Sequence, residues 1–308
     1  MNNKLPEFSI IVNCLNGEQF LKRSLDSIFN QTYQDFEVIF FDNNSSDSSA
    51  EIAKSYGSKI KYYKSIETHS LGKARDMAVD LANGKFIAYL DVDDLWKESK
   101  LEVQRSLFND SIDFVYTNTL VTDDDKNSFT LFNYSKPARG EIFDDLLKRD
   151  FIPTSSISIR RESLSKLEKR YDHNLTLECD RDFILRLSMV GKCDYTNECM
   201  TERFLHKTNT IFQEKDASFF ELEELKKKIV EITSNENNHF ESLNIFIANI
   251  DEKIARSYWN NGKKILARNI FRKHKKYTKH LVLFFLTFIL PNKLDMRKLS
   301  EIIRKVRR

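Results

Sequence analysis

The sequence predicts an α/β fold with a central, mainly parallel sheet, followed by a C-terminal helical region. Short apolar runs rich in β-branched residues alternate with amphipathic stretches up to Leu90. Strands that alternate with helices in this way form parallel sheets with helices on both faces. Beyond Asp216 nearly every stretch has helical periodicity. We therefore expect two regions, at 1–215 and 216–308.

The elements of the first region follow one another in a regular order. Asn16 is expected to cap the first helix, and Gly57 is expected to end the second. The predicted strands lie at 8–14, 36–42, 59–63 and 85–90, with helices at 17–31, 50–57 and 70–84. The regularity then weakens, with further strands predicted at 112–120, 127–133 and 156–160 and a helix at 180–191.

Charge is distributed unevenly along the chain. The 308 residues carry a net charge of +3, yet residues 261–308 hold 15 Lys or Arg against only Asp295 and Glu301. Residues 1–260 hold 34 basic and 44 acidic residues, which is a net charge of −10. The basic C-terminal stretch is therefore expected to have an electrostatic role of its own.

Cysteine usage favours a reduced, cytoplasmic setting. The four cysteines, at positions 14, 179, 193 and 199, form no CxxC pair and no metal spacing interleaved with histidine. The first residues do not have the pattern of a signal peptide. We expect four ordinary, semi-buried thiols.

Three predicted strands of the first region are followed at once by polar residues. Asn16, Asp42 and Asp91 each come just after a strand. Because the carboxyl ends of parallel strands meet at one edge of a sheet, and ligands gather there, these side chains are expected to face a common ligand.

The sharpest local signal is the run Asp91-Val92-Asp93-Asp94 at the end of an apolar strand. Residues two apart on an extended segment face the same way, so Asp91 and Asp93 are expected to act on one ligand. Adjacent carboxylates repel one another unless a cation or strong donors are present. A hard divalent ion, Mg²⁺ or Mn²⁺, fits them and commonly shares its shell with substrate phosphates. The alternative is a solvated acidic turn in which Asp94 caps a helix that starts near Leu95.

The order of four motifs is more specific than any one of them. They are SIIVNCLNGEQFL, SIFNQTY, EVIFFDNNSSDSS and GKARDMAVDLANGKFIAYLDVDD. In this order, and over roughly residues 8–210, the chain resembles the inverting glycosyltransferases of family 2, whose nucleotide-binding domain has the Rossmann-like, A-type fold. The resemblance implies a catalytic domain at 1–215, with a nucleotide-sugar half at about 1–120 and an acceptor half at about 121–215.

The resemblance also implies roles for the residues at the sheet edge. Asp42 would contact the nucleotide base, Arg75 would contact the donor near its diphosphate, and Asn16 would line the nucleotide pocket. Asp91 would approach the ribose and the sugar, while Asp93 would ligate the metal. Structural interpretations stay open, with Asn16 and Asp42 as helix caps and Arg75 as a surface residue of its helix.

A general base for the acceptor hydroxyl is implied as well. The family places this base in a Glu-Asp pair that opens a helix, and the matching run CDRDFILRL at 179–187 makes Asp180 the base. Asp182 and Arg186 are four apart on this helix and are expected to form a structural ion pair. His206, in the run RFLH, matches a family histidine near the donor phosphate or the metal, with a structural role as the alternative.

Some positions depart from the family pattern. Asp76 stands where asparagine is usual, and Cys179 replaces the glutamate before the base. Trp96 either stacks on a sugar or lies in the core, which is the favoured interpretation.

With the resemblance, these residues predict the transfer of a sugar from a nucleoside diphosphate-sugar, with a UDP-sugar favoured, to a hydroxyl acceptor. The resemblance and the C-terminal region imply that the acceptor is a glycan or lipid-linked and belongs to bacterial surface polysaccharide synthesis. Mn²⁺ or Mg²⁺ is the expected cofactor. Two alternatives stay open: a metal-dependent nucleotidyltransferase, and a non-catalytic partner protein that binds the nucleotide-sugar without turnover. A dinucleotide oxidoreductase is disfavoured, because NCLNGEQF and not GxGxxG follows the first strand.

The C-terminal region contains the apolar run HLVLFFLTFIL at 280–290, which is too short to span a bilayer because a spanning helix needs about 20 residues. Residues 292–308 are predicted to form a basic amphipathic helix. Two interpretations are equally favoured: attachment to an anionic membrane, at the inner face of the cell membrane, or a helical hairpin packed on the catalytic domain. No motif indicates nucleic acid binding.

Overall fold

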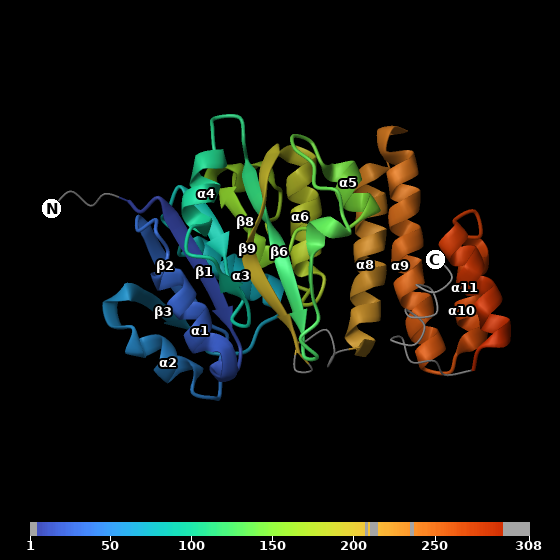
Figure 1. The fold of residues 1–308 in the computed structure, drawn as a ribbon, viewed down its shortest axis with the longest axis horizontal. Coiled ribbons are helices and arrows are strands. Elements are labelled where there is room, and N and C mark those ends of the chain that lie inside the picture. The colour runs from blue at the N-terminus through green and yellow to red at the C-terminus, as the bar shows by residue number, and fades with distance from the viewer. Residues whose placement is uncertain (1–4, 207–208, 210–214, 235–236, 292–308) are drawn as a thin grey trace. The chain divides into compact units, whose positions relative to one another are not determined.

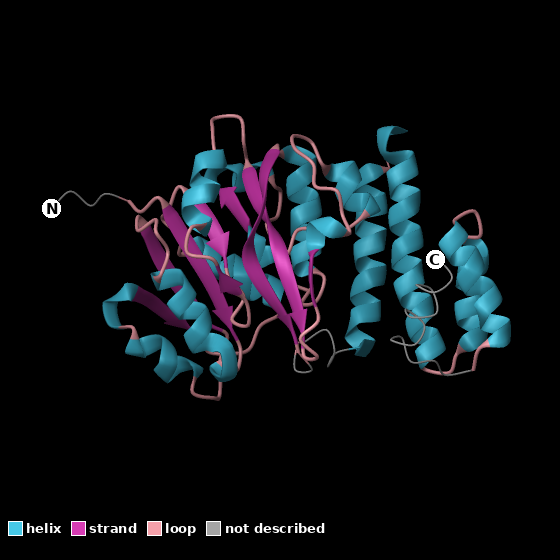
Figure 2. Ribbon diagram, in the orientation of Figure 1, coloured by secondary structure: helices cyan, strands magenta, loops and turns pink. Residues whose placement is uncertain are grey.

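The structure, a computed structural model, describes residues 5–206, 209, 215–234 and 237–291 (Figure 1). The chain divides into two compact units, Met1–Ser218 and Phe219–Arg308, which are described separately here. The first unit is an α/β unit with a mainly parallel sheet, and the second is helical (Figure 2). The predicted fold class is confirmed.

The described residues form one nine-stranded sheet with the order β3-β2-β1-β4-β8-β6-β9-β5, and β7 pairs with β6. The first four strands in this order run parallel, as do β6 and β9, whereas β8 is antiparallel to both of its neighbours. The strands are β1 (Phe8–Cys14), β2 (Phe36–Asp42), β3 (Ile60–Lys64), β4 (Phe86–Tyr89), β5 (Leu95–Trp96), β6 (Phe114–Asp123), β7 (Ser128–Thr130), β8 (Ile157–Arg160) and β9 (Cys193–Leu205).

The helices of the first unit connect these strands. They are α1 (Glu18–Phe29), α2 (Ser49–Ser55), α3 (Leu71–Asp80), α4 (Lys100–Leu107), α5 (Phe143–Lys148) and α6 (Cys179–Val190). The short 3₁₀ helix η3 (Thr154–Ser156) precedes β8.

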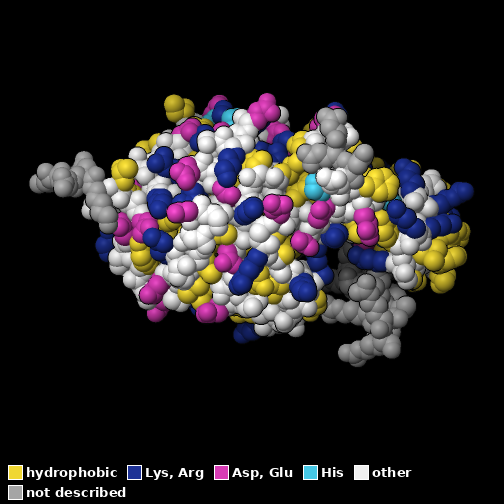
Figure 3. All heavy atoms as spheres, turned by 90° about the horizontal axis from the view of Figure 1, so that it is seen from above, with side chains coloured by type: hydrophobic (Ala, Val, Ile, Leu, Met, Phe, Trp, Pro, Cys, Tyr) yellow, Lys and Arg dark blue, Asp and Glu magenta, His cyan; other side chains and the backbone are white. Residues whose placement is uncertain are grey.

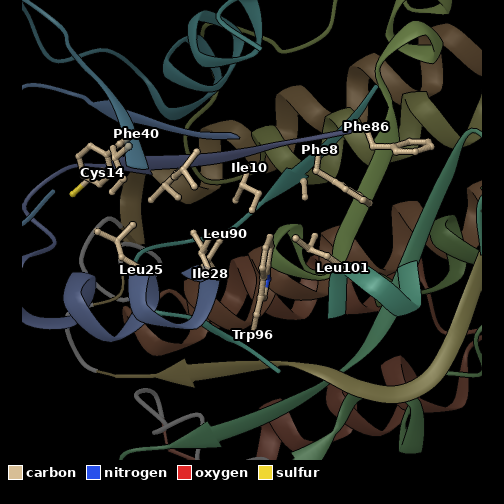
Figure 4. Close-up of a cluster of buried hydrophobic side chains, with 14 of the residues drawn as sticks. Phe8, Ile10, Cys14, Leu25, Ile28, Phe40, Phe86, Leu90, Trp96 and Leu101 are labelled. Carbon is tan, nitrogen blue, oxygen red and sulfur yellow. The ribbon is translucent and has the colours of Figure 1, made fainter. Parts of the chain in front are cut away.

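The main core lies on one face of the sheet. Alternate residues of β1 point to this face, and they pack with apolar residues of α1 and α4 (Figure 4). Trp96 is 4% exposed in this cluster, so the core interpretation of Trp96 is confirmed. The labelled members include Phe8, Ile10, Cys14, Leu25, Ile28, Phe40, Phe86, Leu90 and Leu101.

The opposite face of the sheet is covered by α3. The side-chain amide of Asn13 in β1 donates to the backbone oxygen of Ala74 at 2.9 Å, which ties this helix to the first strand. Ser70 caps α3, because its hydroxyl accepts from the backbone N–H of Lys73. Arg75, one turn into α3, therefore has a fixed position behind the strand ends.

Two local predictions are wrong. Asn16 does not cap α1: Gly17 holds the cap position, and Asn16 takes a left-handed conformation with φ 55°. No helix starts near Leu95, because Leu95 and Trp96 pair with β9 as the strand β5, and α4 begins only at Lys100. Asp94 is 2% exposed and is thus not a solvated cap. In both places, contacts with residues that are distant in the sequence outweigh the local sequence preference.

The second unit contains α9 (Phe240–Asn260), α10 (Lys264–Lys273), α11 (Thr278–Ile289) and most of α8 (Lys215–Thr233). Trp259 of α9 packs with Phe271 and Leu283 from the two helices that follow. No helix within the described ranges has the length and apolar character needed to cross a bilayer. The amphipathic helix predicted for 292–308 lies outside the described residues.

Candidate active site

Arg75 joins two acidic residues from different parts of the chain. Its Nη2 donates to Asp91 Oδ1 at 2.8 Å and to Asp180 Oδ2 at 2.8 Å, and its Nε lies 2.6 Å from Asp180 Oδ1. Its side chain is 1% exposed, whereas those of Asp91 and Asp180 are 37% and 25% exposed. The surface interpretation of Arg75 is therefore wrong, and the two carboxylates face the solvent edge with a buried cation behind them.

A close approach of the backbone holds this arrangement. Gly72, three residues before Arg75 in α3, donates its N–H to the backbone oxygen of Leu175 at 3.0 Å. A Cβ at Gly72 would lie 2.2 Å from the backbone oxygen of Asp172, so a larger residue would push the two segments apart. The segment that leads into α6, and hence to Asp180, is thus fixed against the helix that carries Arg75.

Asp76 strengthens the same contact between α3 and the segment that leads into α6. Its carboxylate pairs with Arg170 Nε at 2.7 Å and with His173 Nε2 at 2.9 Å, and Arg170 also pairs with Asp80. The departure from asparagine at position 76 therefore supplies a negative charge to a cationic segment just before α6.

A second group forms around Asp93. His206 Nε2 lies 3.1 Å from Asp93 Oδ2, and Asn209 Nδ2 donates to the same oxygen at 2.8 Å. The His206 ring lies against Phe20 of α1, with ring centroids 4.4 Å apart, and Arg23 of α1 donates to the backbone oxygen of Asp93. Because Asp91 and Asp93 are two residues apart, the two groups meet at the end of β4.

Sequence reasoning missed the cation on the other side of the acidic run. Arg203, near the end of β9, interacts electrostatically with Asp94, Asp91 and Asp93. The acidic run itself indicated such a cation, because three carboxylates within four residues need a nearby positive charge. Asn209 and the η3 hydroxyls were missed too: Ser155 Oγ accepts from the backbone N–H of Asp91 at 3.0 Å.

The electrostatics of the carboxylates differ from those of surface acids. Burial raises the pKa of Asp93, and the charge of Asp91 adds to the effect. The pKa of Asp94 is raised well above its usual value, by burial and by the charges of Asp91 and Asp93. Burial also raises the pKa of Asp180, although Arg75 opposes the shift. The cluster holds more negative charge than its neighbours neutralise, and a divalent cation would stabilise it.

The residues present fit a metal ion that shares its shell with a substrate. Within the described ranges, no group of three or more His, Cys, Asp or Glu side chains is arranged to hold a metal. Asp93 and His206 do lie together, and Mg²⁺-like ions often bind through one or two carboxylates plus substrate phosphates. These two residues could hold such an ion together with the phosphates of a substrate.

Asn16 and Asp42 lie at the ends of β1 and β2 and share one neighbour. Ser45 donates its backbone N–H to Asp42 Oδ1 at 2.7 Å, and its hydroxyl accepts the N–H of Asn16 at 3.0 Å. Asp42 is fully buried, and its other oxygen accepts from the Tyr62 hydroxyl. Asp42 thus accepts a hydrogen bond within the loop that follows β2 and does not cap α2, whose cap position is Ser48. The interpretation of Asp42 as a helix cap is wrong.

The buried ion pair predicts the effect of removing its cation. Arg75→Gln is expected to lower the free energy of unfolding by about 3 kcal/mol or more, because two carboxylates lose their buried counter-ion. Arg139→Gln is the control: Arg139 pairs with Asp194 at 2.7 Å but is 64% exposed, and exposed pairs contribute about 1 kcal/mol or less. Urea denaturation of the parent and both variants measures the difference. Equal midpoints for the two variants would contradict a buried bridge at Arg75.

The strand order and the acidic run that ends β4 define a glycosyltransferase A-type fold. The model of one family, described as glycosyl transferase family 2, matches residues 9–168. The chain belongs to this family, and the resemblance inferred from its motifs is confirmed.

Similar proteins are named as glycosyltransferases. A putative teichuronic acid biosynthesis glycosyltransferase, TuaG of Bacillus subtilis, is 27% identical over 66% of this chain and 80% of its own. The UDP-Glc:alpha-D-GlcNAc-diphosphoundecaprenol beta-1,3-glucosyltransferase WfgD of Escherichia coli is 36% identical over 36% of this chain and 44% of its own. The chain spans 64% of the length of two other curated relatives.

Solved structures share the fold at low identity. S. aureus TarS 1-349 in complex with UDP-GlcNAc superposes with a TM-score of 0.66 at 16% identity, covering 86% of this chain and 79% of that one. The mannosyltransferase PcManGT from Pyrobaculum calidifontis, in complex with GDP-Man and Mn²⁺, gives a TM-score of 0.57 at 14% identity, covering 92% and 85%. These likenesses show the fold alone.

Proposed function

We propose that this protein is an inverting glycosyltransferase that moves a sugar from a nucleoside diphosphate-sugar, a UDP-sugar above all, to a hydroxyl of a glycan or lipid-linked acceptor. The observation that carries the proposal is the chain of ion pairs Asp91–Arg75–Asp180 at the end of β4, directly beside the Asp93–His206 pair. In this proposal Asp93 and His206 form the metal-binding part of the site, and the partly exposed Asp180 is the base. An inverting transfer needs a base and a leaving-group site that are separate in this way.

In this proposal each residue has one task. Asp180 accepts the proton of the acceptor hydroxyl, and its raised pKa keeps it more basic than a surface aspartate. Arg75 holds Asp91 and Asp180 in position from the buried side. Asp93 and His206 hold Mn²⁺ or Mg²⁺, which when bound stabilises the charge of the leaving diphosphate. Asn16 lines the nucleotide side of the site, and the fully buried Asp42 supports it through Ser45, which hydrogen-bonds to both residues.

The family membership and the neighbours support the donor class and the metal. The TarS fragment binds UDP-GlcNAc and the Pyrobaculum enzyme is in complex with GDP-Man and Mn²⁺, so their common fold accommodates such donors. WfgD acts, by its name, on a diphosphoundecaprenol-linked sugar. We therefore propose a lipid-linked or polymeric glycan acceptor at the cytoplasmic face of a bacterial membrane.

The proposed function is tested by donor binding and by product analysis. A panel of nucleotide-sugars with and without Mn²⁺ should contain one donor that raises the melting temperature only with the metal, because binding to the folded state stabilises it by about 2.7 kcal/mol at a hundredfold excess over Kd. Slow hydrolysis of that donor should release free sugar and nucleoside diphosphate. Release of sugar phosphate would instead indicate a nucleotidyltransferase, and binding without any turnover would indicate a non-catalytic protein.

A further inference from the structure

The helices α10 and α11 expose apolar side chains on the hairpin that they form. One side of this hairpin packs on α9 through Phe271 and Leu283. Five large apolar side chains stay between 46% and 78% exposed, and we call them the hairpin patch. They are Ile265, Leu266, Phe285, Phe288 and Ile289.

The two helices bring the parts of the patch to one end of the hairpin. Arg268 of α10 donates through Nε to Thr287 Oγ1 at 3.0 Å and through Nη2 to the Thr287 backbone oxygen at 3.0 Å. Lys264 Nζ donates to the backbone oxygen of Leu290. The start of α10 is therefore held beside the end of α11, and both of these helix ends carry exposed apolar side chains.

Cations accompany the apolar side chains of the hairpin, and one of them is neutralised, because Lys279 pairs with Glu252 of α9 at 2.8 Å. Residues 261–291 contain eight Lys or Arg and no Asp or Glu. The Arg268 guanidinium lies 3.8 Å from the ring centroid of Phe288, and Lys275 Nζ lies 4.1 Å from that of Phe284. Figure 3 shows Lys and Arg side chains gathered next to hydrophobic ones over the C-terminal helices. Long basic side chains that lie along aromatic rings keep their charges near an apolar surface.

We propose that the hairpin patch is a docking face for an anionic lipid membrane. Apolar side chains would enter the boundary between headgroups and acyl chains, and the Lys and Arg around them would meet lipid phosphates. This inference deepens the proposed function, because a lipid-linked acceptor lies in such a surface. The hairpin packs on α9 and presents the patch at the same time, so packing of the C-terminal helices and membrane attachment are compatible.

Charge argues against the other occupants. The segment 292–308 carries seven Lys or Arg and two acidic residues, so a cationic hairpin repels it. A second copy could match the charge through residues 1–260, which carry a net charge of −10. Its own apolar hairpin, however, carries the same eight cations and would be repelled. An anionic bilayer supplies both the negative charge and the apolar interior.

The test uses the full chain and vesicles without donor or acceptor. Sedimentation with vesicles of phosphatidylglycerol and phosphatidylcholine, against phosphatidylcholine alone, measures the partition coefficient. The double variant Phe285→Ser/Ile289→Ser should bind anionic vesicles at least about tenfold more weakly, because it removes buried apolar area. Lys273→Gln and Lys276→Gln should each weaken binding about fivefold, and added salt should weaken it further.

Matched variants elsewhere control for these changes. Ile66 and Phe240 are 99% and 74% exposed outside the hairpin, and Ile66→Ser/Phe240→Ser should bind anionic vesicles like the parent. Melting curves confirm that all variants fold. The proposal is overturned if the parent ignores anionic vesicles, if the patch variants bind as the parent does, or if the parent is a dimer that the patch variants dissociate. Donor turnover, measured separately, tests the proposed function and not the docking face.

Discussion

Asp180→Asn is expected to lower turnover by about 10²-fold or more while leaving the Kd for the donor within about twofold, because the variant loses a general base and keeps the shape of the site. The asparagine oxygen can still accept a hydrogen bond from Arg75, which stays paired with Asp91 at 2.8 Å. Single-turnover kinetics with donor and acceptor, together with calorimetric titration of the donor, separate the two effects.

Asp194→Asn is the matched control for this prediction. Asp194 is also paired with an arginine, Arg139, and its side chain is 24% exposed against 25% for Asp180. The control should retain the turnover of the parent. If Asp180→Asn instead weakens donor binding by the same factor as turnover, Asp180 is a donor ligand or a structural residue and not the base.

Asp93→Asn is expected to remove the metal dependence of donor binding, with an affinity in Mn²⁺ at least about 100-fold below that of the parent. Loss of even an outer-shell partner costs about 10- to 100-fold in metal affinity, and we propose Asp93 as a direct ligand. The variant should also lose the contribution of His206 to metal binding, because Nε2 of that ring lies 3.1 Å from the Asp93 carboxylate, which positions it. Thermal shift with the donor, with and without Mn²⁺, gives the readout.

Asp76→Asn provides the comparison for Asp93→Asn. Asp76 also pairs with a histidine, His173, at 2.9 Å, and its side chain is 18% exposed against 23% for Asp93. It lies in α3 and belongs to the junction before α6. The Asp76→Asn variant should bind donor with the Mn²⁺ dependence of the parent. If Asp93→Asn keeps that dependence as well, the metal assignment is wrong.

The sequence predicted the parts of the fold that local patterns determine. The strands that became β1 to β4 were predicted from apolar runs, and the ion pair of Asp182 and Arg186 was predicted from i,i+4 spacing and is present at 2.6 Å. The strand β9 was not predicted, because its residues CDYTNECMTERFL mix polar and apolar side chains without a steady alternation. Its pairing with β6 and β5 depends on distant residues.

The same distinction applies to the candidate site. The motif order pointed to Arg75, Asp91 and Asp180, but no sequence pattern indicates that one guanidinium bridges carboxylates 16 and 105 residues away. Asp94 was taken as a possible cap because Asp often precedes helices, whereas tertiary pairing of Leu95 buries it. The charge balance of the acidic run predicts a nearby cation, but only the structure identifies it as Arg203.

The position of β9 in the sheet affects the order in which the site forms during synthesis. The strands β3, β2, β1 and β4 pair among themselves through residues that precede Leu90. Some partners of the acidic run, however, come from β9 and the residue after it, since Leu95 pairs with Glu202 and Asp93 with His206. Domains form progressively as the chain leaves the ribosome, and contacts between distant residues form late. A nascent chain that ends at residue 168 thus carries the acidic run and Arg75 without Asp180, Arg203 or His206. The candidate active site therefore cannot be complete before residue 206 has been synthesised.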